Sequence, residues 1–202
     1  LYENTFLIVA FKPPFLLVHD DGNIQDTLQA RVNGYLQLNQ NKYPAQAIHR
    51  IDYETSGLVL FCKHPFFQAY CDKNMEEHHI KKEYIALVQG HTNYKNKKII
   101  SNIAKDRHNA KKMIIHPNGK ESVSIFNTLK NYKDCSLIQV TILTGRKHQI
   151  RVQCASLNHP ILNDPLYGGK KIDNTGLLLQ SHHIQFNDVD ITCPQEKRFI
   201  RK

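Results

Sequence analysis

The sequence lacks the features of a membrane-spanning, a secreted or a disulfide-stabilised protein. No apolar run in its 202 residues approaches the roughly 18 that a membrane helix needs. The N-terminus has no basic region followed by an apolar core and a small-residue cleavage site. The five cysteines are scattered and never spaced C-x-x-C, which argues against a disulfide framework and a zinc knuckle. We therefore expect reduced thiols, no metal and a cytoplasmic location.

Acidic residues are the scarcer charged class, with 18 Asp and Glu against 27 Lys and Arg and a formal net charge of +9. Such a surplus attracts polyanions, although it also serves solubility. A composition of 41% hydrophobic and 22% charged residues is typical of a globular protein that folds alone. With no internal repeat or low-complexity tract, we expect one domain over residues 1–202. Because the chain begins at Leu1 rather than Met, we expect it to be part of a longer protein.

Strands are predicted wherever β-branched or alternating apolar residues form short runs. They are expected at 6–11, 15–18, 57–62, 81–89, 98–103, 112–116, 122–129, 136–143, 176–186 and 188–193. The segment 57–62 is continuously apolar, which indicates a strand buried on both faces. Pro13 and Pro14 interrupt the first two runs. Residues 91–120 are polar and rich in lysine, and we expect them to form a mobile basic lobe rather than a linker.

Three helices are predicted from apolar spacing. Apolar residues recur every four positions from Ile24 to Leu36, with Asn23 or Asp26 as the expected cap. A second helix is expected within 64–79, where a proline occupies the first turn. A third is expected within 146–158, with a stripe of Ile150, Cys154 and Leu157 and a left-handed stop at Asn158. Strands outnumber helices, so we predict an α+β fold with a mostly antiparallel, mixed sheet flanked by helices.

The segment "AIHRIDYETSGLVLFCK", residues 47–63, places ionisable side chains directly before an apolar run. In an extended chain, Arg50 and Asp52 point to one side and Ile51 to the other. The residues "TSG" at 55–57 predict a turn before the buried strand. Loops at the mouth of a rigid sheet often carry function, whereas a surface ion pair is the simpler alternative.

A second segment, "TGRKHQIRVQCASLNHP" at 144–160, places two donor groups near the start of a helix. His148 and Arg151 share one face, where the helix dipole favours an anion, either a phosphate or a protein carboxylate. Asp52 is the candidate carboxylate, because a paired aspartate stays ionised, as a nucleophile must. Taken in isolation, Asp164 could be a catalytic residue, but the prolines and glycines around it predict a structural turn that walls the site.

Four segments together resemble the RluA family of RNA pseudouridine synthases, in the order and with spacing similar to that of the family. They are "HRIDYETSGLVLFCK", "KKEYIALVQG", "TGRKHQIRVQCASLNHPILNDPLYGG" and "GLLLQSHHIQF". The opening "YENTFLIVAFKP" is also similar, so the resemblance covers nearly the whole chain. It implies the pseudouridine synthase catalytic fold, isomerisation of uridine to pseudouridine in RNA, and no metal or organic cofactor. We expect a monomer, with any accessory RNA-binding domain lying outside this chain.

The resemblance also implies roles for individual residues. Asp52 would be the nucleophile, Arg151 would pair with it, and Tyr84 would stack on the target base. Arg50 would fill the space left by the flipped uridine, because a base within a helix must leave the stack to react. The remaining residues expected to contact the substrate are His49, Arg146 and His148. Whether Asp52 attacks ribose C1′ or uracil C6 is left open, and ribosomal RNA is preferred to transfer RNA as the substrate.

The sequence departs from the family pattern at "KPPFLLV", at Tyr53, and at Ser122 and Ser124, and we expect these changes to alter which RNA is accepted. Two alternatives remain at this level. One is a non-catalytic RNA-binding protein that keeps the fold, although such a protein does not need Asp52. The other is a hydrolase that uses Asp52 with Glu54, but residues two apart do not give the usual opposed geometry. Adjacent histidine pairs are poor metal sites, because neighbours on a strand point apart.

Overall fold

The computed structural model describes residues 2–20, 22 and 26–201. The chain forms two compact units. The first unit runs to Lys81 and adds Ser181–Cys193, and the second unit contains Lys82–Gln180 and the residues from Pro194 onward. A single catalytic domain can contain two such units, so the expectation of one domain stays a prediction.

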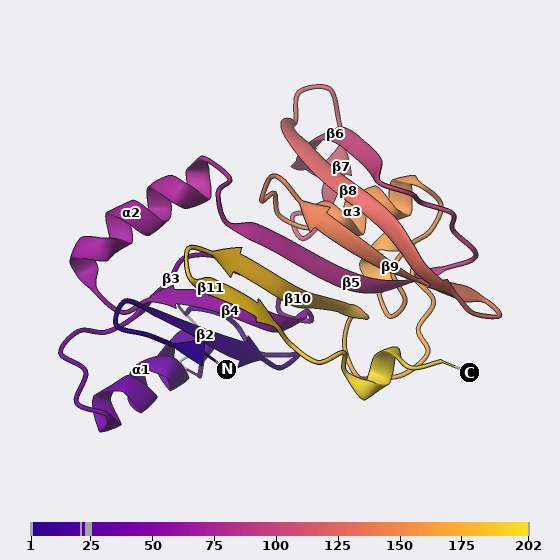
Figure 1. Cartoon of the computed structure of the whole chain (residues 1–202). Coiled ribbons are helices and arrows are strands. Elements are labelled where there is room, and N and C mark those ends of the chain that lie inside the picture. The colour runs from indigo at the N-terminus through magenta and orange to yellow at the C-terminus, as the bar shows by residue number, and fades with distance from the viewer. Residues whose placement is uncertain (1, 21, 23–25, 202) are drawn as a thin grey trace. The chain divides into compact units, whose positions relative to one another are not determined.

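The first unit is built on strands in the order β1, β2, β4 and β10, with β3 beside β4 and β11 beside β10 (Figure 1). The pairs β1–β2, β2–β4, β3–β4 and β10–β11 are antiparallel. The strands are β1 Tyr2–Glu3, β2 Leu7–Lys12, β3 Gln46–Ala47, β4 Ser56–Cys62, β10 Leu179–Phe186 and β11 Val189–Thr192. The helices are α1 Leu28–Leu38 and α2 Pro65–Glu76. Strand β4 is buried at every position, which confirms the strand expected from its continuous apolar run.

Two local expectations for this unit were wrong. No strand forms at 15–18, because Phe15 adopts a positive φ of 62° in a turn after the two prolines. Asp26 does not cap α1; the N-cap is Thr27, whose hydroxyl accepts a hydrogen bond from the Ala30 amide at 3.1 Å. Ile24 and Asn23, which the sequence suggested for the start of this helix, lie outside the described residues.

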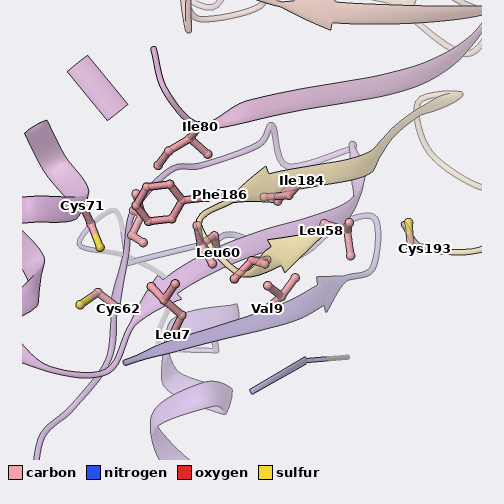
Figure 2. Packing of buried hydrophobic residues seen from close by; sticks show 12 residues of the cluster. Leu7, Val9, Leu58, Leu60, Cys62, Cys71, Ile80, Ile184, Phe186 and Cys193 are labelled. Atoms are coloured by element: carbon pink, nitrogen blue, oxygen red, sulfur yellow. The ribbon is translucent and has the colours of Figure 1, made fainter. Parts of the chain in front are cut away.

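The core of the first unit lies between the sheet and α2 (Figure 2). Leu58 and Leu60 from β4 pack with Leu7 and Val9 from β2 and with residues of β10. Cys71 reaches this cluster from α2, and burial raises the pKa of its thiol to about 12. The thiol is therefore an uncharged core group at neutral pH. All five cysteines are free and buried, as expected for reduced thiols.

The second unit is an antiparallel sheet in the order β5, β9, β8, β6 and β7. The strands are β5 Lys81–Gln89, β6 Lys97–Lys105, β7 Met113–Ile115, β8 Lys120–Asn131 and β9 Cys135–Ile142. Helix α3 spans Gln149–Ser156, and two short 3-10 helices follow, η1 Pro165–Tyr167 and η2 Lys197–Phe199. A small core cluster joins Ile103 of β6, Met113 of β7 and Val152 of α3 to Tyr167.

The observed fold confirms the α+β class with a mostly antiparallel sheet. Helices α2 and α3 form where they were expected, and α3 stops before Asn158, which has the left-handed φ of 63°. The lysine-rich stretch contains β6, β7 and the turn between them, which confirms the two strands expected at 98–103 and 112–116. None of the described helices is long and apolar enough to cross a membrane.

Candidate active site

The loop between β3 and β4 carries three of the predicted site residues, His49, Arg50 and Asp52. Exposure alternates along it as an extended segment requires: Arg50 is exposed, Ile51 is 8% exposed and Asp52 is half-buried. The loop ends in a turn in which the Thr55 amide donates to the Asp52 carbonyl at 3.1 Å. The turn therefore lies at 53–54, and the expectation of a turn at "TSG" was wrong, because Ser56 and Gly57 already belong to β4.

Lys12, which the sequence analysis missed, is fully buried beside this loop. Its ammonium donates to three carbonyl oxygens, those of Pro13 at 3.0 Å, Leu16 at 2.8 Å and Tyr53 at 3.1 Å. A buried cation is stable only when its donors are satisfied, so Lys12 anchors the backbone immediately after Asp52. A lysine that ends an apolar strand just before two prolines was the available signal.

Two further contacts hold the loop against the sheet. The Nε2 atom of His49 accepts a hydrogen bond from the Leu60 amide at 3.2 Å, so this ring is attached to the backbone of β4. Gly57 has a φ of 115°, and a Cβ there would lie 2.2 Å from the carbonyl oxygen of Ser181. Only glycine permits this close approach of β4 to β10, which fixes where the Asp52 loop leaves the sheet.

In the second unit, Arg151 forms a buried ion pair with Asp164. The two side chains are 5% and 0% exposed, and Arg151 donates through Nε and Nη2 to the two carboxylate oxygens, both at 2.8 Å. A bidentate guanidinium–carboxylate pair fixes the side chain in direction as well as in charge. The expected turn at Asp164 is present, since its carbonyl accepts from the Tyr167 and Gly169 amides. Sequence reasoning missed its carboxylate, because the partners are 13 residues apart and meet only in the fold.

Two glutamines of α3, Gln149 and Gln153, hold this helix against β8 and were also missed. Gln149 is 3% exposed and donates to the Ser124 hydroxyl at 2.8 Å, while that hydroxyl donates to Gln153 at 2.8 Å. Gln153, which is fully buried, also donates to Ser122 at 3.3 Å. Spaced i and i+4, the glutamines share one helix face, and their network sets the rotation of α3 and hence the position of Arg151. The two serines that depart from the family pattern therefore act inside the protein.

The residues at the start of α3 are held by further contacts. His148 is the residue before the helix and has a left-handed φ of 54°, and its Nδ1 lies 2.9 Å from the Tyr167 hydroxyl. The Nε of Arg146 donates to the Glu121 carbonyl at 2.9 Å, and its backbone amide donates to Gln149. The structure thus brings His148 and Arg151 together around Tyr167, whose ring centroid lies 5.2 Å from the Arg151 guanidinium carbon.

Tyr84 lies in β5 opposite Val140 of β9 and is 6% exposed. Lys82, two residues earlier, points to the same face because strand side chains alternate. Lys82 is also 6% exposed, and burial lowers its pKa to about 8. The face of β5 that carries the predicted stacking tyrosine therefore also carries a lysine that titrates close to neutral pH.

The low pKa of Lys82 predicts how stability changes with pH. Below pH 8 the lysine is charged in the folded and unfolded states, and the folded state bears the cost of burying that charge. Because the pKa of an unfolded lysine is about 10.4, this cost disappears as the pH rises from about 8 to about 10.4. Wild-type stability relative to Lys82→Met should therefore rise over this range, by up to about 3 kcal/mol.

Chemical denaturation at pH 7 and at pH 10 measures this change, and Lys81→Met at the exposed neighbour is the matched control. The difference between wild type and the control should be nearly the same at the two pH values. If the free energy of unfolding of wild type relative to Lys82→Met is also the same at pH 7 and pH 10, the low pKa assigned to Lys82 is contradicted.

The predicted site residues divide between the two units. His49, Arg50 and Asp52 belong to the first, and Tyr84, Arg146, His148 and Arg151 belong to the second. The pairing of Asp52 with Arg151 and the stacking of Tyr84 on a base stay predictions. No group of three or more potential metal ligands converges within the described part of the chain.

Comparison with known proteins decides the family. The family model described as "RNA pseudouridylate synthase" matches residues 6–156, which include the Asp52 loop, Tyr84 and Arg151. The chain belongs to this family. The resemblance drawn from the four motifs is thereby confirmed, and relatives named ribosomal large subunit pseudouridine synthase C and D support it.

Among relatives of this RNA pseudouridylate synthase family member, the Bacillus subtilis protein named "Uncharacterized RNA pseudouridine synthase YhcT" is 34% identical over 84% of the chain and 57% of its own length. "Ribosomal large subunit pseudouridine synthase C" of Buchnera aphidicola is 35% identical over 86% of the chain and 55% of its own length. The chain thus spans little more than half of these relatives. The structure titled "Human RNA Pseudouridylate Synthase Domain Containing 1" has a TM-score of 0.81 at 23% identity, covering 96% of this chain and 82% of its own, which shows a shared fold.

Proposed function

We propose that this protein isomerises a specific uridine in structured RNA to pseudouridine, with Asp52 as the nucleophile. The observation that carries the proposal is that the family match spans the Asp52 loop and both second-unit residues, Tyr84 and Arg151. Ribosomal RNA is the preferred substrate and transfer RNA the second, because curated relatives at 35% and 36% identity are named for the large ribosomal subunit.

The site residues have the chemistry that this reaction needs. The glycosidic C–N bond must break, the uracil must turn, and a C–C bond must form through C5, so the base has to be held throughout. A half-buried aspartate on a loop anchored by Lys12 offers an attacking carboxylate in a fixed position. The flat ring of Tyr84 suits stacking on the flipped base. Arg151 is already held rigidly by Asp164, so little side-chain entropy remains to be lost when the substrate binds.

Tritium release tests the proposal directly. When pseudouridine forms, the hydrogen on C5 of uridine is lost to solvent, so RNA labelled with tritium at C5 should release label in proportion to product. Ribosomal and transfer RNA from cells lacking this protein are the two substrates to compare. Release from neither RNA would favour the alternative of a non-catalytic RNA-binding protein that keeps the fold.

The basic lobe, defined here as β6, β7 and the turn between them, is the proposed phosphate-binding surface. Four cationic side chains gather in and beside its turn: Lys105, Arg107, Lys111 and Lys112. Asp106 lies between Lys105 and Arg107, and its carboxylate accepts a hydrogen bond from the His108 amide at 2.9 Å. Phosphate contacts position RNA without reading its bases.

Replacing these four lobe cations by glutamine should weaken binding of all RNAs alike. The log–log dependence of affinity on salt should flatten by roughly 0.7 to 0.9 per lost phosphate contact. Turnover at saturating RNA should fall much less than the affinity, because Asp52 and Tyr84 are unchanged. Filter binding across a salt series measures both effects. An unchanged affinity and slope would show that the lobe is a solvated surface and that the RNA path lies elsewhere.

A further inference from the structure

The Tyr167 hydroxyl joins the basic lobe to the start of α3. It accepts a hydrogen bond from the buried Met113 amide of β7 at 2.8 Å and lies 2.9 Å from Nδ1 of His148. Residue 113 is separated from the other two by more than 30 positions in the sequence, so only the fold brings them to one oxygen atom. The amide is the first of β7, where the chain returns from the turn that carries the lobe cations.

The Tyr167 ring makes a second set of contacts between the same elements. The Arg151 guanidinium carbon lies 5.2 Å from the ring centroid, and the Lys112 ammonium lies 5.6 Å from it. Tyr167 is 8% exposed and packs in the cluster with Ile103 and Met113 of the lobe and Val152 of α3. One side chain therefore contacts a lobe cation, the lobe backbone and the arginine of the candidate active site.

We propose that Tyr167 is a positioning residue that couples phosphate binding by the basic lobe to the placement of Arg151. Its hydroxyl fixes the first residue of β7, so the lobe cannot shift without disturbing His148 and α3. RNA phosphates held by the lobe are then in register with the side chains of α3. This inference rests on the proposed function, because it assigns a role in the same RNA reaction.

The coupling is tested by a double-mutant cycle between Tyr167→Phe and the lobe pair variant, defined as Lys105→Gln with Arg107→Gln. Phenylalanine keeps the ring and its contacts with Arg151 and Lys112, and removes only the hydroxyl. In the wild-type background the lobe pair variant should lower both RNA affinity and kcat/KM. In the Tyr167→Phe background the lobe pair variant should still lower affinity, but its effect on kcat/KM should be much smaller. The fold-change in kcat/KM of the combined variant should differ from the product of the two separate fold-changes by roughly fivefold.

Tyr94→Phe is the matched control. Tyr94 is a buried tyrosine of the same unit, 8% exposed, whose ring packs against Phe126 and His159. The fold-changes in kcat/KM caused by Tyr94→Phe and by the lobe pair variant should simply multiply when the two are combined. If Tyr167→Phe also combines multiplicatively, while lowering only the melting temperature, the role of Tyr167 is structural and the proposal is overturned.

Hydrogen exchange gives a readout that does not need catalysis. The Met113 amide and the amides of 106–112 should exchange faster in Tyr167→Phe than in wild type, whereas Tyr94→Phe should leave them unchanged. Unchanged exchange in Tyr167→Phe overturns the coupling whatever the activity. If the wild-type protein releases no tritium while Tyr167→Phe shows the faster exchange, only the proposed reaction is contradicted, so the two failures are distinguishable.

Discussion

Replacing Asp52 by asparagine should abolish pseudouridine formation while the fold and the affinity for RNA remain unchanged. The amide is nearly the same size as the carboxylate, so the half-buried position in the loop is kept. It carries no negative charge and is not a nucleophile, so the covalent step cannot begin. Tritium release and direct RNA binding, measured on the same preparation, separate loss of chemistry from loss of binding.

Glu54→Gln is the matched control, since it neutralises a carboxylate two residues away in the same loop. We expect it to retain most of the activity, whereas a hydrolase that used Asp52 and Glu54 as a pair would lose activity in both variants. Product above the no-enzyme level from Asp52→Asn would remove Asp52 from the role of nucleophile.

Replacing Arg151 by methionine should abolish activity and also destabilise the protein, by about 3–5 kcal/mol, because the Asp164 carboxylate would remain buried without its bidentate partner. Chemical denaturation measures the loss, and tritium release measures the activity. A melting temperature equal to that of wild type would contradict a structural contribution from this pair.

The double variant Arg151→Met with Asp164→Leu separates the two roles of Arg151. Removing both charges leaves apolar groups in the buried site, and such replacements are often neutral for stability. We therefore expect the double variant to regain most of the stability lost in Arg151→Met, with activity still absent. Recovery of activity along with stability would show that Arg151 acts only through the fold.

The strands and helices of this chain were largely predictable, because most of their signals are local. The apolar run of β4 specifies a buried strand, and Pro65 begins α2 where the sequence indicated. The failures were at short-range details. Phe15 lies in a turn although the apolar run at 15–18 favours a strand. Thr27 caps α1 although Asp26, the residue before it, is also a common N-cap residue. When neighbouring residues have similar propensities, only the path of the folded backbone decides which of them takes a given role.

The sequence by itself determined the family, the α+β class and the candidate residues Asp52, Tyr84 and Arg151, because motifs and hydrophobic periodicity are properties of neighbouring positions. Only the tertiary structure decided what holds those residues: Lys12 behind the Asp52 loop, Asp164 on Arg151, and Tyr167 between the lobe and α3. Hydrogen bonds and ion pairs act over a few ångströms, and these partners are 13 to 54 positions apart in the chain. Their pairing therefore exists only once the chain has folded.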